Sequence, residues 1–194
     1  SPVVNAVANA AYCDNTPGAA ISFSSPTTGG TITYSWTSTA NVGFGTGANG
    51  NIPAYTATNN TTSVVTATIT VTPHVTNNSV TCDGTPITFT VTVSSSPMVN
   101  AVANLIYCNN TPGAAINFSS STTGGTVNYT WSSSVNVGFG LNGNGNIAAF
   151  TAVNNSFSPL VATGTGTPSG KGGTGSPTTF TLTFNPNANS CTIR

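Results

Sequence analysis

An internal repeat constrains this chain more than any other feature. The stretch from Pro2 to Thr61 returns from Pro97 to Ser156, an offset of 97 − 2 = 95 residues, with 41 identities in 60 aligned positions and no gap. A unit of that size is an ordinary domain, and a repeat of this kind indicates a tandem array. We therefore expect two domains, over residues 1–95 and 96–194, joined at the short polar stretch "SSSP".

Within each unit the hydrophobic residues recur with a period of two. The segment 31–37, "TITYSWT", places Ile32, Tyr34 and Trp36 on one face and hydroxyl side chains on the other. Segments 65–72 and 87–93 alternate in the same way, and further strands are expected near 19–24 and 53–57. This alternation is typical of half-buried antiparallel strands, and no amphipathic helix is evident. The sequence predicts an all-β chain of two tandem immunoglobulin-like antiparallel β-sandwiches.

The second unit is less regular in its C-terminal part. Gly164 and Gly166 stand where the first unit has Ile69 and Val71, and four residues are lost before Phe180. We expect one strand of the second unit to be frayed or reshaped there.

Charge is almost absent from the chain. Only 2% of the residues are charged, and the formal net charge is zero. Two cations cannot form a basic patch, so the composition excludes nucleic acid as a partner and disfavours an anionic membrane surface. No apolar run has the length of a membrane span. A neutral polar surface gives copies little mutual repulsion, so self-association is expected.

Four cysteines, two in each unit, indicate disulfides and an oxidising, extracellular location. Four expected strand crossings separate Cys13 from Cys82, and an even number returns the chain to the same end, so these two are predicted to bond. Cys108 matches Cys13, but no cysteine matches Cys82 in the second unit. Cys191 is the remaining partner, and it could close the second unit or bond to a neighbouring chain.

Motifs for catalysis, metals or cofactors are weak, and we expect none of the three. "GFGTGANGN", Gly43 to Asn51, fits a phosphate-binding glycine pattern, but a strand and not a helix follows it, so a wide turn is predicted. His74 is expected in a solvated loop. Asp14 and Asp83 could meet to hold a weak calcium ion if the disulfide brings them together, but turn-capping roles are favoured. The chain is therefore predicted not to be an enzyme.

Two sets of residues are candidates for binding. The glycine-flanked phenylalanines either plug the domain beneath their loops or contact a glycan together with nearby asparagines: Phe44, Asn49, Asn51, Phe139, Asn144 and Asn146. The terminal strands could add to the sheet edge of another copy, which would make a fibre. That assembly contact would comprise Val3, Val4, Val7, Phe180, Leu182 and Phe184.

Several segments together resemble a known repeat family. "PVVNAVAN", "TPGAAI", "TGGTITYSW", "VTATITVTP", "CDGTP" and "TFTVTV" are similar to PKD-like, immunoglobulin-like repeats of long secreted and cell-surface proteins of the Bacteroidota. The resemblance implies a β-sandwich spacer or adhesive module without an active site. We expect a non-enzymatic structural module of an exported bacterial surface protein, and specifically a fibre subunit assembled by terminal-strand and edge contacts. The alternative is a carbohydrate-binding or spacer module of a long secreted adhesin.

Overall fold

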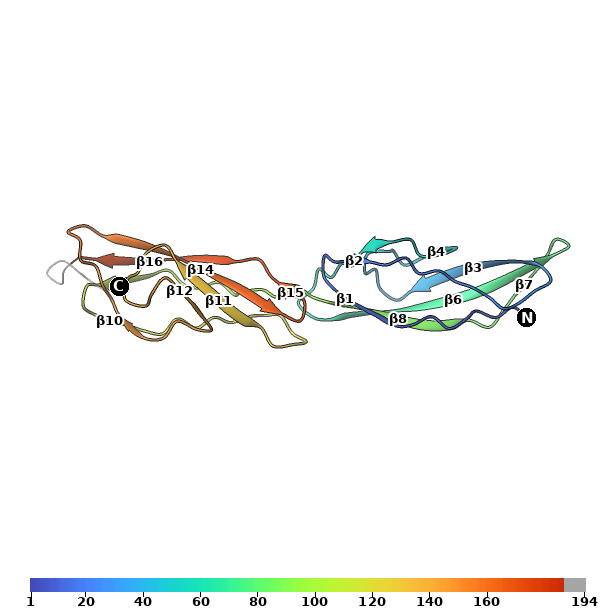
Figure 1. Cartoon of the computed structure of the whole chain (residues 1–194), viewed down its shortest axis with the longest axis horizontal. Coiled ribbons are helices and arrows are strands. Elements are labelled where there is room, and N and C mark those ends of the chain that lie inside the picture. The colour runs from blue at the N-terminus through green and yellow to red at the C-terminus, as the bar shows by residue number, and fades with distance from the viewer. Residues whose placement is uncertain (187–194) are drawn as a thin grey trace. The chain divides into compact units, whose positions relative to one another are not determined.

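The structure is a computed structural model that describes residues 1–186. The chain divides into two compact units, Ser1–Ser95 and a second that begins at Ser96. The described residues form strands, turns and extended segments and no helix (Figure 1). Each unit is a sandwich of one continuous sheet and one looser layer, so the predicted immunoglobulin-like fold is confirmed.

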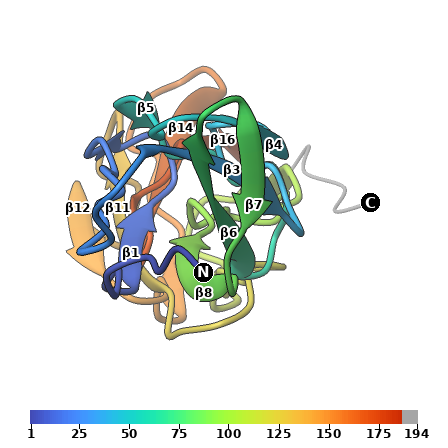
Figure 2. The same ribbon diagram turned by 90° about the vertical axis from the view of Figure 1, so that its right-hand side faces the viewer.

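The main sheet of the first unit has five strands in the order β1-β8-β6-β3-β4, with β7 added to the end of β6. Pairing is antiparallel except between β1 and β8, which run parallel. The strand bounds are β1 Ala10–Cys13, β3 Thr31–Ser38, β4 Gly47–Asn49, β6 Val65–Asn77, β7 Val80–Asp83 and β8 Ile87–Ser94. β6 and β7 lie side by side as a hairpin (Figure 2), and this hairpin extends beyond the start of β8 (Figure 1).

The second layer of this unit has few ladder hydrogen bonds. The strands predicted near 19–24 and 53–57 appear as the two-residue pair β2 (Pro17–Gly18) and β5 (Tyr55–Thr56) and a single bridge between Ile21 and Ile52. Side chains hold this layer against the sheet. Phe23 and Ile52 are buried in one cluster with Trp36 of β3 and the inward residues of β6 and β8.

The second unit repeats this arrangement. Its main sheet has the order β12-β11-β14-β16-β9, with β15 added to β14 and with β9 parallel to β16, and β10 pairs with β13 in the other layer. The strand bounds are β9 Leu105–Cys108, β10 Pro112–Gly113, β11 Asn128–Ser133, β12 Asn142–Asn144, β13 Phe150–Thr151, β14 Leu160–Gly170, β15 Gly173–Thr174 and β16 Thr178–Asn185.

The glycines in β14 do not fray that strand. It pairs along its length with β11 and β16, so the predicted disruption is absent. Aromatic rings take the space of the missing aliphatic side chains, because a Cβ on Gly164 or Gly166 would collide with the ring of Phe180 or Phe118. The glycines therefore change which side chains pack on β14, whereas its hydrogen-bonded pairing with β11 and β16 is retained.

Candidate functional site

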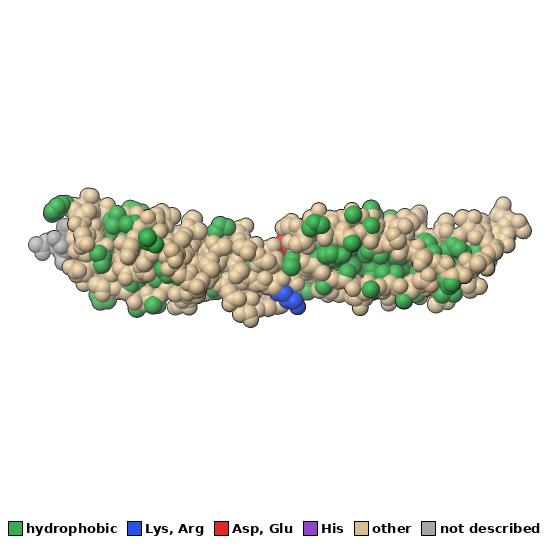
Figure 3. All heavy atoms as spheres, in the orientation of Figure 1, with side chains coloured by type: hydrophobic (Ala, Val, Ile, Leu, Met, Phe, Trp, Pro, Cys, Tyr) green, Lys and Arg blue, Asp and Glu red, His purple; other side chains and the backbone are tan. Residues whose placement is uncertain are grey.

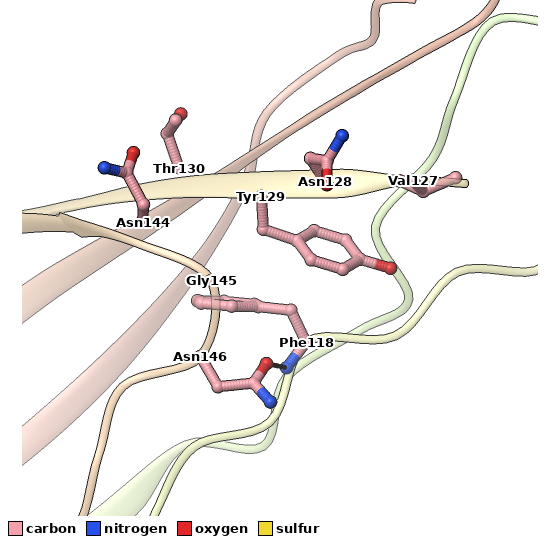
Figure 4. Close-up of a pocket in the computed structure, with 8 residues that line it drawn as sticks. All are labelled: Phe118, Val127, Asn128, Tyr129, Thr130, Asn144, Gly145 and Asn146. Carbon is pink, nitrogen blue, oxygen red and sulfur yellow. Dashed lines mark hydrogen bonds between the residues drawn. The ribbon is translucent and has the colours of Figure 1, made fainter.

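Each unit has an open groove beside the β3–β4 or β11–β12 edge of its main sheet. In the first unit the groove measures about 660 Å³ and is lined by Phe23, Ile32, Thr33, Tyr34, Asn49, Gly50, Asn51 and His74. In the second unit it measures about 520 Å³ and is lined by Phe118, Val127, Asn128, Tyr129, Thr130, Asn144, Gly145 and Asn146 (Figure 4). Most of these positions correspond through the 95-residue repeat, so the same concave surface occurs twice in the chain.

Backbone hydrogen bonds fix the shape of the groove. After β4 the chain turns at Gly50, which has φ 79°, and its N–H donates to the Tyr34 carbonyl over 2.8 Å. The Asn51 Oδ1 then accepts a 2.8 Å hydrogen bond from the Phe23 N–H, which ties the turn to the opposite layer. In the second unit Gly145 donates to Tyr129 over 2.9 Å, and the Asn146 Oδ1 accepts from Phe118 over 2.9 Å. The groove is thus preformed in both units.

An aromatic pair forms the apolar wall of each groove. The ring centroids of Phe23 and Tyr34 lie 5.7 Å apart, and those of Phe118 and Tyr129 are also 5.7 Å apart. The phenylalanine is buried in each pair and the tyrosine is half-buried, so the tyrosine presents the accessible ring. Burial raises the pKa of Tyr34 above its ordinary value, so its phenol stays a neutral hydrogen-bond donor to a higher pH.

The two glycine-flanked phenylalanines pack as plugs beneath their own loops and remain half-buried. The Phe44 ring packs edge-on against Trp36 and Tyr55, with centroid distances of 5.7 and 4.9 Å. Phe139 packs in the same way against Trp131 and Phe150, at 5.6 and 4.9 Å. The wide turn that the glycines form directs each ring under its own loop, which is the packing expected of the plug alternative.

The four predicted asparagines line the grooves, but they do not converge on a ligand. Asn51 and Asn146 use their Oδ1 atoms to hold the backbone, as described above. Figure 4 shows that Asn144 points away from the rings of Phe118 and Tyr129. Asn49 occupies the corresponding position, directly opposite Ser35 in the β3–β4 register. Sequence reasoning missed Tyr34 and Tyr129 as groove residues, because the alternation in segment 31–37 placed Tyr34 on the apolar face with Ile32 and Trp36.

The glycine loop itself is a wide turn, as predicted. Gly43 and Gly45 have φ 119° and 89°, and both N–H groups donate to the Asn41 Oδ1, over 3.0 and 2.9 Å. A Cβ on Gly43 would overlap the carbonyl oxygen of Thr56. These contacts occupy the loop amides that a phosphate would need.

The predicted Cys13–Cys82 disulfide is wrong. Cys13 pairs with Ser94 at one end of the main sheet, whereas Cys82 pairs with Val75 beyond the other end, and no bond joins them. Val65 lies opposite Val93 near the Cys13 end, so about ten residues of β6 separate the two cysteines, or roughly 33 Å at 3.3 Å per residue. Strand β4 adds a crossing inside the glycine-rich loop, which makes the number of crossings odd.

The cysteine positions bear on one further expectation. Asp14 and Asp83 adjoin the two separated cysteines, so the calcium site that required their approach is also excluded. Cys108 is buried at the end of β9 beside Asn185. Cys191 lies outside the described residues. Within residues 1–186 no group of three or more His, Cys, Asp or Glu side chains could hold a metal ion.

The proposed assembly residues lie mostly inside their own units. Phe180, Leu182 and Phe184 are core residues of β16, an interior strand between β14 and β9. Val4 is buried and Val7 packs against the core of the first unit, whereas Val3 is 50% exposed. The terminal strands are already paired or packed, so the structure does not offer this set as a free contact surface.

His74 lies in β6 and not in a loop, and it joins a chain of hydrogen bonds. Its Nε2 is 2.8 Å from the Ser35 Oγ, and its Nδ1 is 2.7 Å from the Asp83 Oδ1. The three side chains come from β3, β6 and β7, where the registers place His74 opposite both Thr33 and Asp83. Periodicity could not reveal this arrangement, because it depends on the hairpin register.

Fold and grooves together define the class of the chain, which is a tandem pair of immunoglobulin-like β-sandwich modules. Among solved structures, the mouse cadherin-23 EC22-24 structure matches with a TM-score of 0.54 and 13% identity, over 98% of this chain and 68% of that one. Protocadherin gamma B2 extracellular cadherin domains 3-6 match with a TM-score of 0.51 and 14% identity, over 97% of this chain and 52% of that one. Such low identities establish the fold alone.

Sequence comparisons add no family to this structural likeness. No protein-family model and no curated protein matches the chain. Within the described part of the chain, no helix has the length and apolarity required to cross a membrane.

Proposed function

We propose that this chain is a structural, adhesive module of an exported bacterial surface protein, and that its grooves bind neutral glycans. The observation that carries the proposal is the repetition of one preformed aromatic groove in two immunoglobulin-like units. The resemblance to PKD-like repeats of secreted proteins and the extracellular cadherin domains among the structural neighbours support the surface location. No turnover chemistry is required for this role.

The character of the grooves favours an uncharged ligand with hydroxyl groups. The only titratable side chains that line them are the two tyrosines and His74, and the groove of the second unit contains no charged side chain. An accessible tyrosine ring can stack on the apolar face of a sugar, while its phenol donates a hydrogen bond. A charged ligand would find no ion-pair partner in the groove of the second unit.

A neutral-glycan array followed by titration of the strongest hit tests this proposal. We expect Tyr34→Ala and Tyr129→Ala each to weaken binding by about tenfold, and the double variant to abolish it. Tyr34→Phe separates ring stacking from the phenol hydrogen bond. Phe157→Ala is the control, because Phe157 is a fully exposed aromatic outside both grooves. Equal loss in Phe157→Ala, or no loss in the tyrosine double variant, would refute the groove as the binding site.

Fibre assembly through sheet edges is a second candidate, supported by the outer strands β4 and β12. All three residues of β4 are exposed, and neither strand contains a charge or a proline to block pairing with another copy. The almost uncharged face in Figure 3 has a band of hydrophobic side chains on the first unit and scattered ones on the second, so it offers little repulsion between copies. Negative-stain electron microscopy of the wild type and of Asn49→Pro should show filaments only for the wild type, because the Asn49 N–H faces away from β3 and proline would remove this donor from the free edge. Filaments in both, or in neither, would exclude β4 as the assembling edge.

A further inference from the structure

The hydrogen-bond chain Ser35–His74–Asp83 has the connectivity of a nucleophile, a base and an orienting carboxylate. Both distances, 2.8 Å from Ser35 Oγ to His74 Nε2 and 2.7 Å from His74 Nδ1 to Asp83 Oδ1, are within the range needed for proton transfer and for positioning. Three neighbouring strands of a regular sheet hold the three side chains. The arrangement is therefore rigid in its backbone and does not depend on a flexible loop.

The carboxylate determines which nitrogen of the neutral imidazole carries the proton. An ionised aspartate only accepts hydrogen bonds, so the Nδ1 beside Asp83 must donate. The Nε2 lone pair of neutral His74 then faces the Ser35 hydroxyl, which donates to it. This is the tautomer in which histidine can remove the serine proton. In the opposite tautomer the proton would be on Nε2, and His74 could not accept the Ser35 proton there.

The surroundings provide access and a second polar group. The His74 side chain is 23% exposed and that of Asp83 is 70% exposed, so small molecules can reach the imidazole. His74 also lines the groove of the first unit. Asn49 lies directly opposite Ser35 in the β3–β4 register, so the two side chains share a face with Cβ atoms about 5 Å apart. The Asn49 amide is thus placed to donate to an oxyanion formed at Ser35.

We propose that Ser35 is a nucleophilic acylation site that takes an acyl group from activated carboxylic esters, with His74 as general base, Asp83 as orienting residue and Asn49 as oxyanion donor. The Ser35 Oγ bonds to the carbonyl carbon while its proton passes to the His74 Nε2. The bond from carbon to the leaving oxygen then breaks, and the Nε2 proton is available to that oxygen. The product is an O-acyl serine, and attack by water in the reverse sequence would release the acid and restore Ser35.

The second unit provides an internal comparison. Thr130 occupies the position of Ser35, Ser169 that of His74, and Thr174 lies opposite Ser169 in the β14–β15 register. No base or carboxylate is present at these positions. The proposal therefore assigns the reactivity to the first unit alone and goes beyond the adhesive function proposed for both.

The test uses the intact chain and p-nitrophenyl acetate in mildly alkaline buffer, with acid quenching, peptide mass mapping and nitrophenolate release. Acetylation of Ser35 should be about 100-fold faster than that of serines and threonines in the second unit, and His74→Gln should remove this excess. Asn49→Ala should slow the reaction, whereas the matched Asn144→Ala should not. Far-ultraviolet circular dichroism establishes that each variant is folded.

Two results would overturn the proposal. One is acetylation of Ser35 at the rate of hydroxyl residues in the second unit. The other is an unchanged Ser35 rate in folded His74→Gln together with an unchanged rate in Asn49→Ala. In either case the three side chains would serve only to fasten the β6–β7 hairpin to β3.

Discussion

Replacing Phe44 by alanine should substantially lower the free energy of unfolding of the first unit. The groove should lose no contact, because Phe44 does not line it. The ring makes two edge-on aromatic contacts, with Trp36 at 5.7 Å and with Tyr55 at 4.9 Å. Removing a core phenylalanine costs about 3 to 5 kcal/mol, and each aromatic pair adds about 0.5 to 1.5 kcal/mol beyond its buried area. Phe44 is half-buried, so we expect the lower end, about 3 kcal/mol.

The two tryptophans make this measurement specific to one unit. Each unit has a single tryptophan in contact with its plug, so Trp131→Phe leaves Trp36 as the only indole. Urea unfolding followed by fluorescence in that background then reports the first unit. If the free energy of unfolding falls by about 2 kcal/mol per M urea, a loss of about 3 kcal/mol lowers the urea midpoint by about 1.5 M. Phe139→Ala should leave this transition unchanged.

An unchanged midpoint in Phe44→Ala would refute the plug assignment. Loss of glycan binding at unchanged stability would restore the exposed contact role that the sequence left open. The comparison is decisive because the two roles predict opposite outcomes in two independent measurements.

Three further sets of substitutions test the loop, the cysteines and the buried amide. Gly43→Ala should destabilise by more than 2 kcal/mol through its clash with a carbonyl, whereas Gly45→Ala, which has open space, should cost about 1 kcal/mol; urea midpoints compare them. Cys82→Ser should leave the stability of the oxidised protein unchanged, whereas loss of a disulfide would cost about 4 kcal/mol. Asn59→Ala should cost about 2 to 4 kcal/mol, because the Asn59 Nδ2 donates to two backbone carbonyls at 2.7 and 2.8 Å. The exposed neighbour Asn60 is the control, and its replacement by alanine should change thermal unfolding little.

Strands in which apolar and polar residues alternate regularly could be predicted from the sequence, and strands without that alternation could not. Residues of β6 and β8 follow the inward and outward alternation expected of them. Strand β4, with the sequence "GAN", contains no large apolar residue and lies in a glycine-rich stretch, so hydrophobic periodicity could not detect it. Missing that single strand reversed the parity of the crossings and produced the wrong disulfide.

The candidate sites depended on register, which the sequence did not specify. The bond from His74 to Asp83 arises because the β6–β7 hairpin turns at positive-φ residues Asn78 and Ser79 and brings positions 74 and 83 opposite each other. The grooves depend on where the second layer crosses the sheet, which is set by the Asn51 hydrogen bond to Phe23. Neither contact leaves a periodic signal along the chain.

The parallel pairing of β1 with β8 bears on how a unit responds to mechanical load. β1 is the first strand of the unit and β8 the last, and Ala10 to Cys13 run beside Val91 to Ser94 in the same direction. A force that pulls the ends of the unit apart therefore acts along the two strands in opposite senses. The hydrogen bonds between them are loaded together in shear and cannot open one at a time. The pairing of β9 with β16 repeats this geometry, so each unit has its own shear clamp between its entry and exit strands.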